Sequence, residues 1–154
     1  MKKLELKDVI DTTLPENEIF DRIMEFFSQN QIKIKQLNKK SVIGMYGSRL
    51  KAHTRGIRAD SSILPVKITI NLQDKENATE LSILMKKGYI GIPPLGLNKK
   101  YLIIFARLMN SLKLQFYKQM YLKKEISKCS NCGKDILYEN QRFCELCGID
   151  LLET

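Results

Sequence analysis

The first thirty residues show two hydrophobic periods in succession. Apolar and polar residues alternate between residues 4 and 10, which predicts a β-strand. Apolar residues then recur every three or four positions, as at Ile19, Ile23 and Phe27. This spacing predicts an amphipathic helix over residues 15–29.

The middle of the chain alternates between apolar and polar residues in short runs. This period of two predicts strands that have one apolar and one polar face. The polar turns between the runs favour antiparallel pairing. The expected strands cover residues 32–35, 42–46, 49–55, 66–72 and 81–86.

A longer amphipathic segment follows a loop at residues 88–96. Its apolar residues recur at three and four positions, which predicts a helix from residue 97 or 98 toward residue 126. The segment from 124 to 128 contains no Gly or Pro that would end the helix earlier. The apolar stripe consists of Tyr101, Ile104, Phe105, Leu108, Leu112 and Phe116.

The order of these elements predicts an α+β fold. An antiparallel sheet with one apolar face needs cover, and the short N-terminal helix and the long C-terminal helix can provide it. The order strand, helix, strands and long helix resembles the helix-grip arrangement of the START and polyketide-cyclase superfamily. That resemblance implies a sheet wrapped around the long helix, with a cavity for a small hydrophobic ligand between them.

All four cysteines lie in the last quarter of the chain, in two Cys-x-x-Cys-Gly motifs. Two residues between cysteines let a tight turn aim both sulfurs at one ion, and two such turns supply a tetrahedral shell. The glycine after each pair can adopt a positive φ that turns backbone amides toward the sulfurs. One structural Zn2+ ion is therefore predicted. Its expected ligands are Cys129, Cys132, Cys144 and Cys147.

The two cysteine motifs flank a short polar hairpin, with a strand expected at residues 136–138 and its return at residues 142–143. Together these features resemble the small zinc-ribbon domain found at the ends of many proteins. The resemblance implies a module that depends on its metal for folding. It divides the chain into an α+β domain at residues 1–126 and a zinc ribbon at residues 127–154.

Disulfides and a redox-active pair are the alternatives for these cysteines. Residues 1–7 mix charged and apolar side chains without the apolar core of a signal peptide, so a reducing, cytoplasmic location is expected. A redox-active Cys-x-x-Cys usually stands alone on a βαβ pattern, whereas two pairs occur here. No apolar run in the sequence is long enough to predict a membrane span.

Charge is unevenly distributed along the chain, whose formal net charge is +9. Residues 26–59 hold eight basic and no acidic side chains, and residues 81–124 hold nine basic and no acidic ones. The remaining segments are net acidic. This segregation favours a functional basic surface over dispersed charge that only keeps the protein in solution.

One face of the expected sheet concentrates the basic residues. Such a face can track the phosphates of a nucleic acid or bind an acidic protein. Tyr46 and Tyr89 are candidates for stacking on bases. The alternative is a solvated lysine-rich face without a specific partner. The candidate basic residues are Lys33, Lys35, Arg49, Lys51, His53 and Arg55.

The loop after the last strand supplies an alternative site. Its apolar residues would form a lid over the cavity that the helix-grip resemblance implies, and a small hydrophobic molecule would then be the ligand. Attachment to a membrane surface through the basic, apolar helix at residues 97–124 is a further alternative. The expected lid residues are Tyr89, Ile92, Pro93, Pro94 and Leu95.

Catalytic motifs are missing from the sequence. It holds no P-loop, no dinucleotide-binding glycine motif and no Gly-x-Ser-x-Gly elbow, and its single histidine is His53. A closed shell of four cysteines leaves no position for a catalytic water. The chain is therefore expected to be a non-catalytic binding module.

Overall fold

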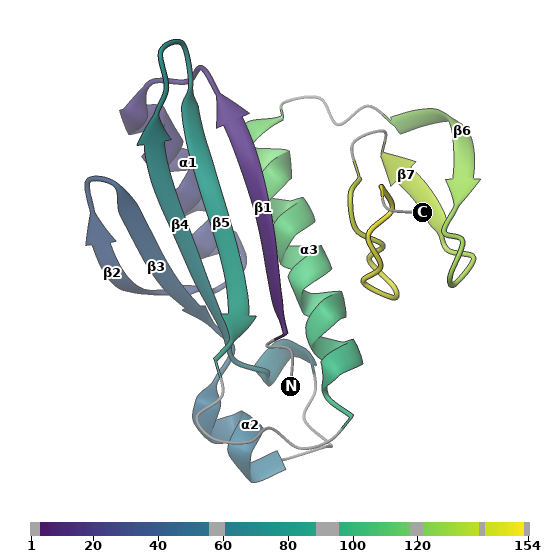
Figure 1. Cartoon of the computed structure of the whole chain (residues 1–154). Helices are drawn as coiled ribbons and strands as arrows, with labels where there is room; N and C mark the ends of the chain where they lie inside the picture. Colours follow the sequence, from purple (N-terminus) through teal and green to yellow (C-terminus); the bar gives the residue numbers. More distant parts are fainter. Residues whose placement is uncertain (1–3, 56–60, 89–95, 118–121, 139–140, 153–154) are drawn as a thin grey trace. The chain divides into compact units, whose positions relative to one another are not determined.

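The computed structural model of the protein (Figure 1) describes the chain apart from its ends and short internal segments. The described residues are 4–55, 61–88, 96–117, 122–138 and 141–152. The chain divides into two compact units, residues 1–97 and residues 98–154. This division places the long helix in the same unit as the cysteines, whereas the sequence suggested a boundary at residue 126.

The first unit is built on a five-stranded antiparallel sheet with the strand order β1-β5-β4-β3-β2 (Figure 1). Strands β2 to β5 pair with their neighbours in sequence, and β1 pairs with β5. Helix α1, at Glu16–Gln29, connects β1 to β2. The strands are β1 at Glu5–Thr12, β2 at Lys33–Asn38, β3 at Ser41–Tyr46, β4 at Val66–Asp74 and β5 at Thr79–Lys87.

One face of this sheet is apolar and buried. In β4 every second residue from Val66 to Leu72 is buried, and the residues between them are at least partly exposed. Helix α1 contributes its own apolar side to the core, through Ile19, Ile23, Phe26 and Phe27. The α+β class and the helix predicted at residues 15–29 are therefore confirmed.

Gly44 in β3 shows how closely α1 approaches the sheet. A Cβ atom at this position would lie 2.5 Å from Ile32 Cγ2 and 2.6 Å from Phe27 Cε2. Contacts between real carbon atoms are longer, so only glycine lets Phe27 pack against this part of β3.

The segment at residues 49–55 is a helix, α2 at Arg49–Arg55, so the strand predicted there is wrong. Gly47 has a φ of 72°, which turns the chain out of β3. Ser48 Oγ then accepts a hydrogen bond from the amide of Lys51 at 3.4 Å, as an N-cap residue does. A Gly-Ser pair before a short basic run was the available signal for this helix.

Burial along α2 explains why its alternating sequence was misleading. Ala52 is fully buried, whereas 75% of Leu50 is exposed, so the apolar residues of this segment do not share one face. A run of seven residues is also too short for its period to separate a strand from a helix.

The second unit begins with helix α3 at Asn98–Phe116. The apolar stripe predicted for it is buried throughout. Whether the sheet of the first unit wraps this helix, as in a helix-grip fold, stays a prediction. In the described part of the chain, no helix combines the length and the apolar character that crossing a membrane requires. The buried stripe consists of Tyr101, Ile104, Phe105, Leu108, Leu112 and Phe116.

Helix α3 ends at Phe116, so the prediction that it continues toward residue 126 is wrong. Strand β6, at Leu122–Lys128, follows instead and pairs antiparallel with β7 at Asp135–Tyr138. The segment contains no helix-breaking residue, but its backbone hydrogen bonds to β7 override local helix propensity. The strand predicted at residues 136–138 is confirmed as part of β7.

Candidate metal centre and basic groove

The four cysteines sit in two turns that share one backbone geometry. In the first turn the amide of Gly133 donates to the carbonyl oxygen of Cys129 at 2.8 Å. In the second turn the amide of Gly148 donates to the carbonyl oxygen of Cys144 at 2.8 Å. The two glycines have φ values of 72° and 75°, in the left-handed region that glycine adopts without a steric penalty. The glycine after each cysteine pair therefore has the positive φ predicted for it.

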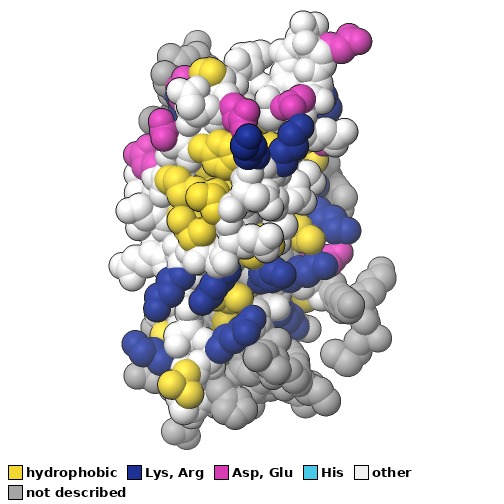
Figure 2. All heavy atoms as spheres, turned by 90° about the vertical axis from the view of Figure 1, so that its left-hand side faces the viewer, with side chains coloured by type: hydrophobic (Ala, Val, Ile, Leu, Met, Phe, Trp, Pro, Cys, Tyr) yellow, Lys and Arg dark blue, Asp and Glu magenta, His cyan; other side chains and the backbone are white. Residues whose placement is uncertain are grey.

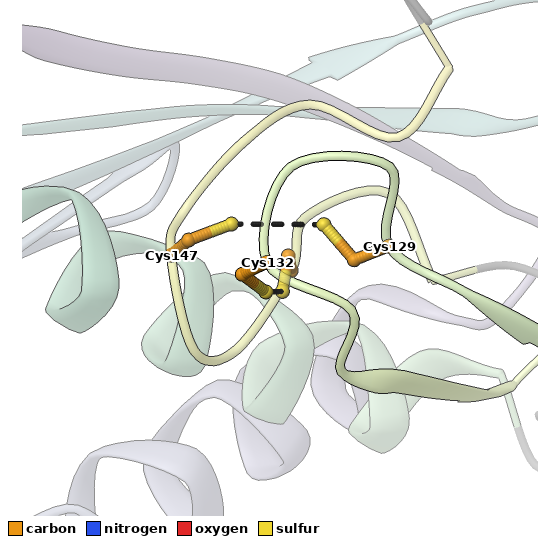
Figure 3. Close-up of side chains that lie close together, drawn as sticks. Cys129, Cys132 and Cys147 are labelled. Atoms are coloured by element: carbon orange, nitrogen blue, oxygen red, sulfur yellow. Dashed lines mark hydrogen bonds between the residues drawn. The ribbon is translucent and has the colours of Figure 1, made fainter.

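The sulfur atoms of the two turns meet in one cluster (Figure 3). Cys129 Sγ lies 3.7 Å from Cys147 Sγ, which belongs to the other turn. Cys132 Sγ and Cys144 Sγ, also from different turns, lie 3.5 Å apart. All four sulfurs lie within 4.8 Å of one another. In a tetrahedral site with Zn–S bonds of about 2.3 Å, neighbouring sulfurs are about 3.8 Å apart, so this spacing fits one tetrahedral ion.

Backbone amides reach the sulfurs from within the same turns. The amide of Lys134 donates to Cys132 Sγ, and the amide of Ile149 donates to Cys147 Sγ. Cys144 Sγ accepts a hydrogen bond from the amide of Cys147. Hydrogen bonds of this kind spread the negative charge of metal-bound thiolates over the surrounding backbone.

The thiols differ in acidity because they share one site. Burial raises the pKa of Cys147. Hydrogen bonds from the Asn131 side chain, a backbone amide and two neighbouring thiols have a larger, opposite effect, so the pKa is lowered to about 6. The amide of Lys134 lowers the pKa of Cys132, yet burial and the other three thiols raise it to about 12. The pKa of Cys144 is raised, mainly by burial. Like charges in one cluster repel, so a bound cation is needed to keep all four sulfurs as thiolates.

Helix α3 contacts the second cysteine turn at two places. A Cβ atom at Gly148 would lie 2.7 Å from Leu102 Cβ, so the backbone of the turn packs directly on the helix. Asn110 Nδ2 donates to the carbonyl oxygen of Phe143 at 3.2 Å in a buried position. Gln141 Nε2 donates to the same oxygen at 3.0 Å. Sequence reasoning missed the two contacts of α3 because they join residues that are far apart along the chain.

The cysteine cluster can hold a metal ion at the four residues predicted for it. The cysteines are free thiols, and their sulfur separations exceed the roughly 2.05 Å of a disulfide bond. Four thiolates are a ligand set typical of zinc. The geometry therefore fits a metal ion held by all four cysteines.

A second candidate site lies on the open face of the sheet in the first unit. A groove of about 590 Å³ is lined by four basic side chains and by no acidic one among the described residues. Figure 2 shows Lys and Arg side chains gathered in a band on the side of the molecule where β2 and β3 lie. The basic lining residues, here called the groove cations, are Lys33, Lys35, Arg49 and Lys67; the others are Gln36, Ile43, Met45, Gly47 and Ser48.

Strand register explains why these cations meet. Lys33 in β2 pairs with Met45 in β3. Met45 pairs with Lys67 in β4, which in turn pairs with Lys86 in β5. Directly paired residues project from the same face of a sheet, so one row with three lysines crosses four strands. Arg49, at the start of α2, adds a further cation beside this row.

The groove cations differ from the basic residues at the opposite end of the same strands. There, Lys40 Nζ lies 3.0 Å from Asp74 Oδ2, and Lys75 Nζ lies 3.3 Å from Asp11 Oδ1. Within the described part of the chain, none of the groove cations forms an ion pair. These two basic residues at the far end of the strands are thus paired with carboxylates, whereas the groove cations are not paired with any described one.

Three of the six basic residues predicted from the sequence, Lys33, Lys35 and Arg49, line the groove. Lys67, which was not predicted, also lines it. Lys51 is exposed on α2 but does not line the groove. The side chains of His53 and Arg55 lie outside the described residues. Lys67 was missed because its own segment, residues 60–80, is net acidic. Its alternation with buried neighbours in β4 was the signal that could have found it.

Two other predictions concern a tyrosine in β3 and the loop after β5. Only 8% of Tyr46 is exposed, so the prediction that it stacks on bases is wrong. The hydrophobic-ligand alternative stays a prediction. Its expected lid residues, Tyr89, Ile92, Pro93, Pro94 and Leu95, lie outside the described residues.

No known protein-family model matches the chain, and no curated protein matches it. The resemblances to a zinc ribbon and to a helix-grip fold therefore rest on the motifs and on the order of elements in this chain, and they stay predictions.

Proposed function

We propose that this protein is a non-catalytic binding module that holds a polyanionic partner in its basic groove and one structural zinc ion in its second unit. The groove carries the binding role, because four cations line it and no acidic residue among the described ones does. Cations held close together repel one another, and an anionic ligand removes that cost.

A solvated lysine-rich face is the alternative reading of the same charge. Elsewhere in the first unit, however, several basic side chains are paired, as Lys7 Nζ is with Glu5 Oε1 at 3.0 Å and Lys40 Nζ is with Asp74 Oδ2 at 3.0 Å. The groove cations instead border a hollow, where low-dielectric walls strengthen the field that a ligand experiences. Their arrangement favours a bound partner over simple solvation.

The zinc assignment rests on the donor set and on its spacing. Four thiolates at tetrahedral distances close the coordination shell and leave no open position for a reactive water. We therefore assign the cysteine turns and the β6–β7 hairpin to a zinc ribbon, joined here to helix α3. Its metal stabilises the fold and takes no part in chemistry.

Metal analysis tests the zinc assignment. Protein purified without a metal-affinity step should contain close to one zinc per chain. Replacing Cys132 and Cys144 together by serine should abolish zinc retention, because two of four ligands are lost. A wild-type chain whose second unit is folded while all four thiols react freely and no metal is present would refute the assignment.

A panel of polyanions tests the binding function. Heparin, polyglutamate and an oligonucleotide should be compared at low salt, using the full zinc-loaded chain. The double variant Lys33→Gln/Lys67→Gln should bind at least about tenfold more weakly than the wild type, since two of the four groove cations are lost.

Lys39 and Lys40 provide a matched control for the polyanion panel. They are exposed residues of the β2–β3 turn, at the other end of the same strands. Lys39→Gln/Lys40→Gln makes the same change in net charge and should alter affinity by less than about twofold, because neither lysine lines the groove. Equal losses in the two variants would show that only net charge matters and would remove the groove as the site.

A further inference from the structure

The strand register places basic side chains on a line that crosses the sheet. The line runs from Lys33 through Met45 and Lys67 to Lys86. Neighbouring strands lie about 4.8 Å apart, so the line is about 14 Å long at the backbone. The sheet is a rigid support, and it therefore presents a linear run of positive charge rather than a single anion pocket.

The cross-strand pair of Lys67 and Lys86 is an unfavourable contact within the protein alone. The two residues are directly opposite each other, and like charges at such a pair destabilise a sheet. Lys86 Nζ lies 3.4 Å from Glu5 Oε2, which offsets part of its charge. Lys67 has no such partner in the described part of the chain and lines the groove. An external anion at Lys67 would relieve the remaining repulsion.

The groove is apolar between its cations. Ile43 and Met45 line it as half-buried residues of β3. Gln36 and Ser48 add polar side chains that can donate hydrogen bonds to anionic oxygens. This combination suits a ligand with regularly spaced negative charge and with apolar surface exposed between the charges.

We infer that the ligand is a single-stranded nucleic acid, whose phosphates follow the line of cations while its bases lie over Ile43 and Met45. This inference rests on the proposed polyanion-binding function and narrows the class of ligand. In a duplex the faces of the bases are stacked on one another, so only phosphates would reach the groove. In a single strand every base has a face that is free to contact the protein.

An acidic peptide fits the surface less well. A sheet usually recognises an extended peptide by pairing it with an open edge strand. The edge nearest the groove is β2, whose register with β3 shifts between Ile34 and Gln36. Such bulges interrupt pairing and protect edge strands from additional partners. The groove cations lie on the face of the sheet, where a strand of nucleic acid can cross it.

The composition of the groove predicts how binding should behave. None of the described residues that line it is aromatic, so the bases contact the aliphatic side chains of Ile43 and Met45 without ring stacking, and the phosphate contacts set the salt dependence. Binding should therefore tolerate different sequences and weaken steeply with salt. Contacts of the groove cations with four phosphates of a single strand give a slope of about −3 for log K against log salt concentration.

Fluorescence anisotropy with the full zinc-loaded chain tests this inference. The probes are a labelled dT strand of about twelve nucleotides, a duplex of equal length and polyglutamate of equal charge, each titrated at several salt concentrations. The single strand should bind at least about tenfold more tightly than the other two, with a slope of about −3.

Variants separate the two parts of the expected contact. Lys33→Gln/Lys67→Gln should flatten the slope to about −1.5, and Lys39→Gln/Lys40→Gln should leave it unchanged. Met45→Ser should weaken binding of the single strand without changing the slope, because it alters the apolar floor and no charge. Circular dichroism and zinc content establish whether each variant is folded. If Met45→Ser does not fold, the variants of the exposed lysines still decide the test.

The outcomes distinguish this inference from the broader function. If polyglutamate or the duplex binds as tightly as the single strand, the inference is wrong and the polyanion-binding function stands. If none of the probes binds even at low salt, both are wrong. An unchanged salt slope in Lys33→Gln/Lys67→Gln would place the nucleic acid elsewhere on the protein and would also overturn the inference.

Discussion

Asn110 on helix α3 donates a hydrogen bond to the backbone carbonyl oxygen of Phe143 at 3.2 Å, although the two residues are 33 positions apart. Both residues are buried, and Phe143 directly precedes Cys144, a member of the cysteine cluster. The bond ties the helix to the start of the second cysteine turn. Helix α3 and the cysteine cluster therefore belong to one structural unit, in agreement with the division of the chain at residue 97.

Replacing Asn110 by alanine should destabilise the second unit. The carbonyl oxygen of Phe143 would lose one of its two donors and keep only Gln141. Loss of one buried hydrogen bond predicts a decrease of about 1–2 kcal/mol in the free energy of unfolding of the zinc-loaded protein, measured by chemical denaturation. Leu114→Ala is a control on the same helix at a side chain that is 44% exposed, and it should cost less. A smaller loss for Asn110→Ala than for Leu114→Ala would contradict the assigned role.

Gly133 and Gly148 allow the contact with α3 to be separated from backbone strain. Both have positive φ, but a Cβ atom at Gly133 would meet nothing within 4 Å, whereas one at Gly148 would lie 2.7 Å from Leu102 Cβ. Gly133→Ala should cost about 1 kcal/mol from strain alone. Gly148→Ala should cost about 3 kcal/mol, because the turn must also move away from the helix. Thermal unfolding of the zinc-loaded variants measures the difference, and equal losses would show that packing on Leu102 contributes nothing.

The parts of the fold that could be predicted are those encoded in short stretches of sequence. Apolar residues alternate with polar ones from residue 66 to 72, and the structure buries the apolar set. The spacing of Ile19, Ile23 and Phe27 likewise predicts the buried side of α1. The cysteine motifs define their turns within five residues each, because the cysteine spacing and the following glycine fix the local backbone.

The parts that could not be predicted depend on partners far away in sequence. Residues 122–128 lack any strand-specific pattern and become β6 by pairing with β7. Lys67 joins Lys33 in the groove only because Met45 lies between them in the register of the sheet. Pairing of this kind depends on the whole fold. Local sequence patterns therefore do not predict correctly which basic residues share the groove.

Zinc affinity should rise with pH. Without metal, Cys132 and Cys144 are protonated at neutral pH because their pKa values are raised, to about 12 for Cys132. Cys147 is already largely a thiolate, since its pKa is lowered to about 6. Zinc must therefore displace at least two protons, and each one contributes about a tenfold increase in affinity per pH unit. Competition with a chelator of known proton affinity should show an increase of at least about 100-fold from pH 7 to 8, and an affinity independent of pH would contradict the thiolate assignment.

Removal of zinc should leave the basic groove functional. The residues that line the groove, from Lys33 to Lys67, belong to the first unit, whereas the metal ligands belong to the second. A structural zinc ion supplies folding energy to its own module, so a chelator should unfold the cysteine turns and the β6–β7 hairpin. Hydrogen exchange measured by mass spectrometry would locate that unfolding. Oligonucleotide affinity should change by less than about twofold, since the groove cations and the four cysteines belong to different units of the chain. A loss as large as that of Lys33→Gln/Lys67→Gln would instead show that binding in the groove requires a folded second unit.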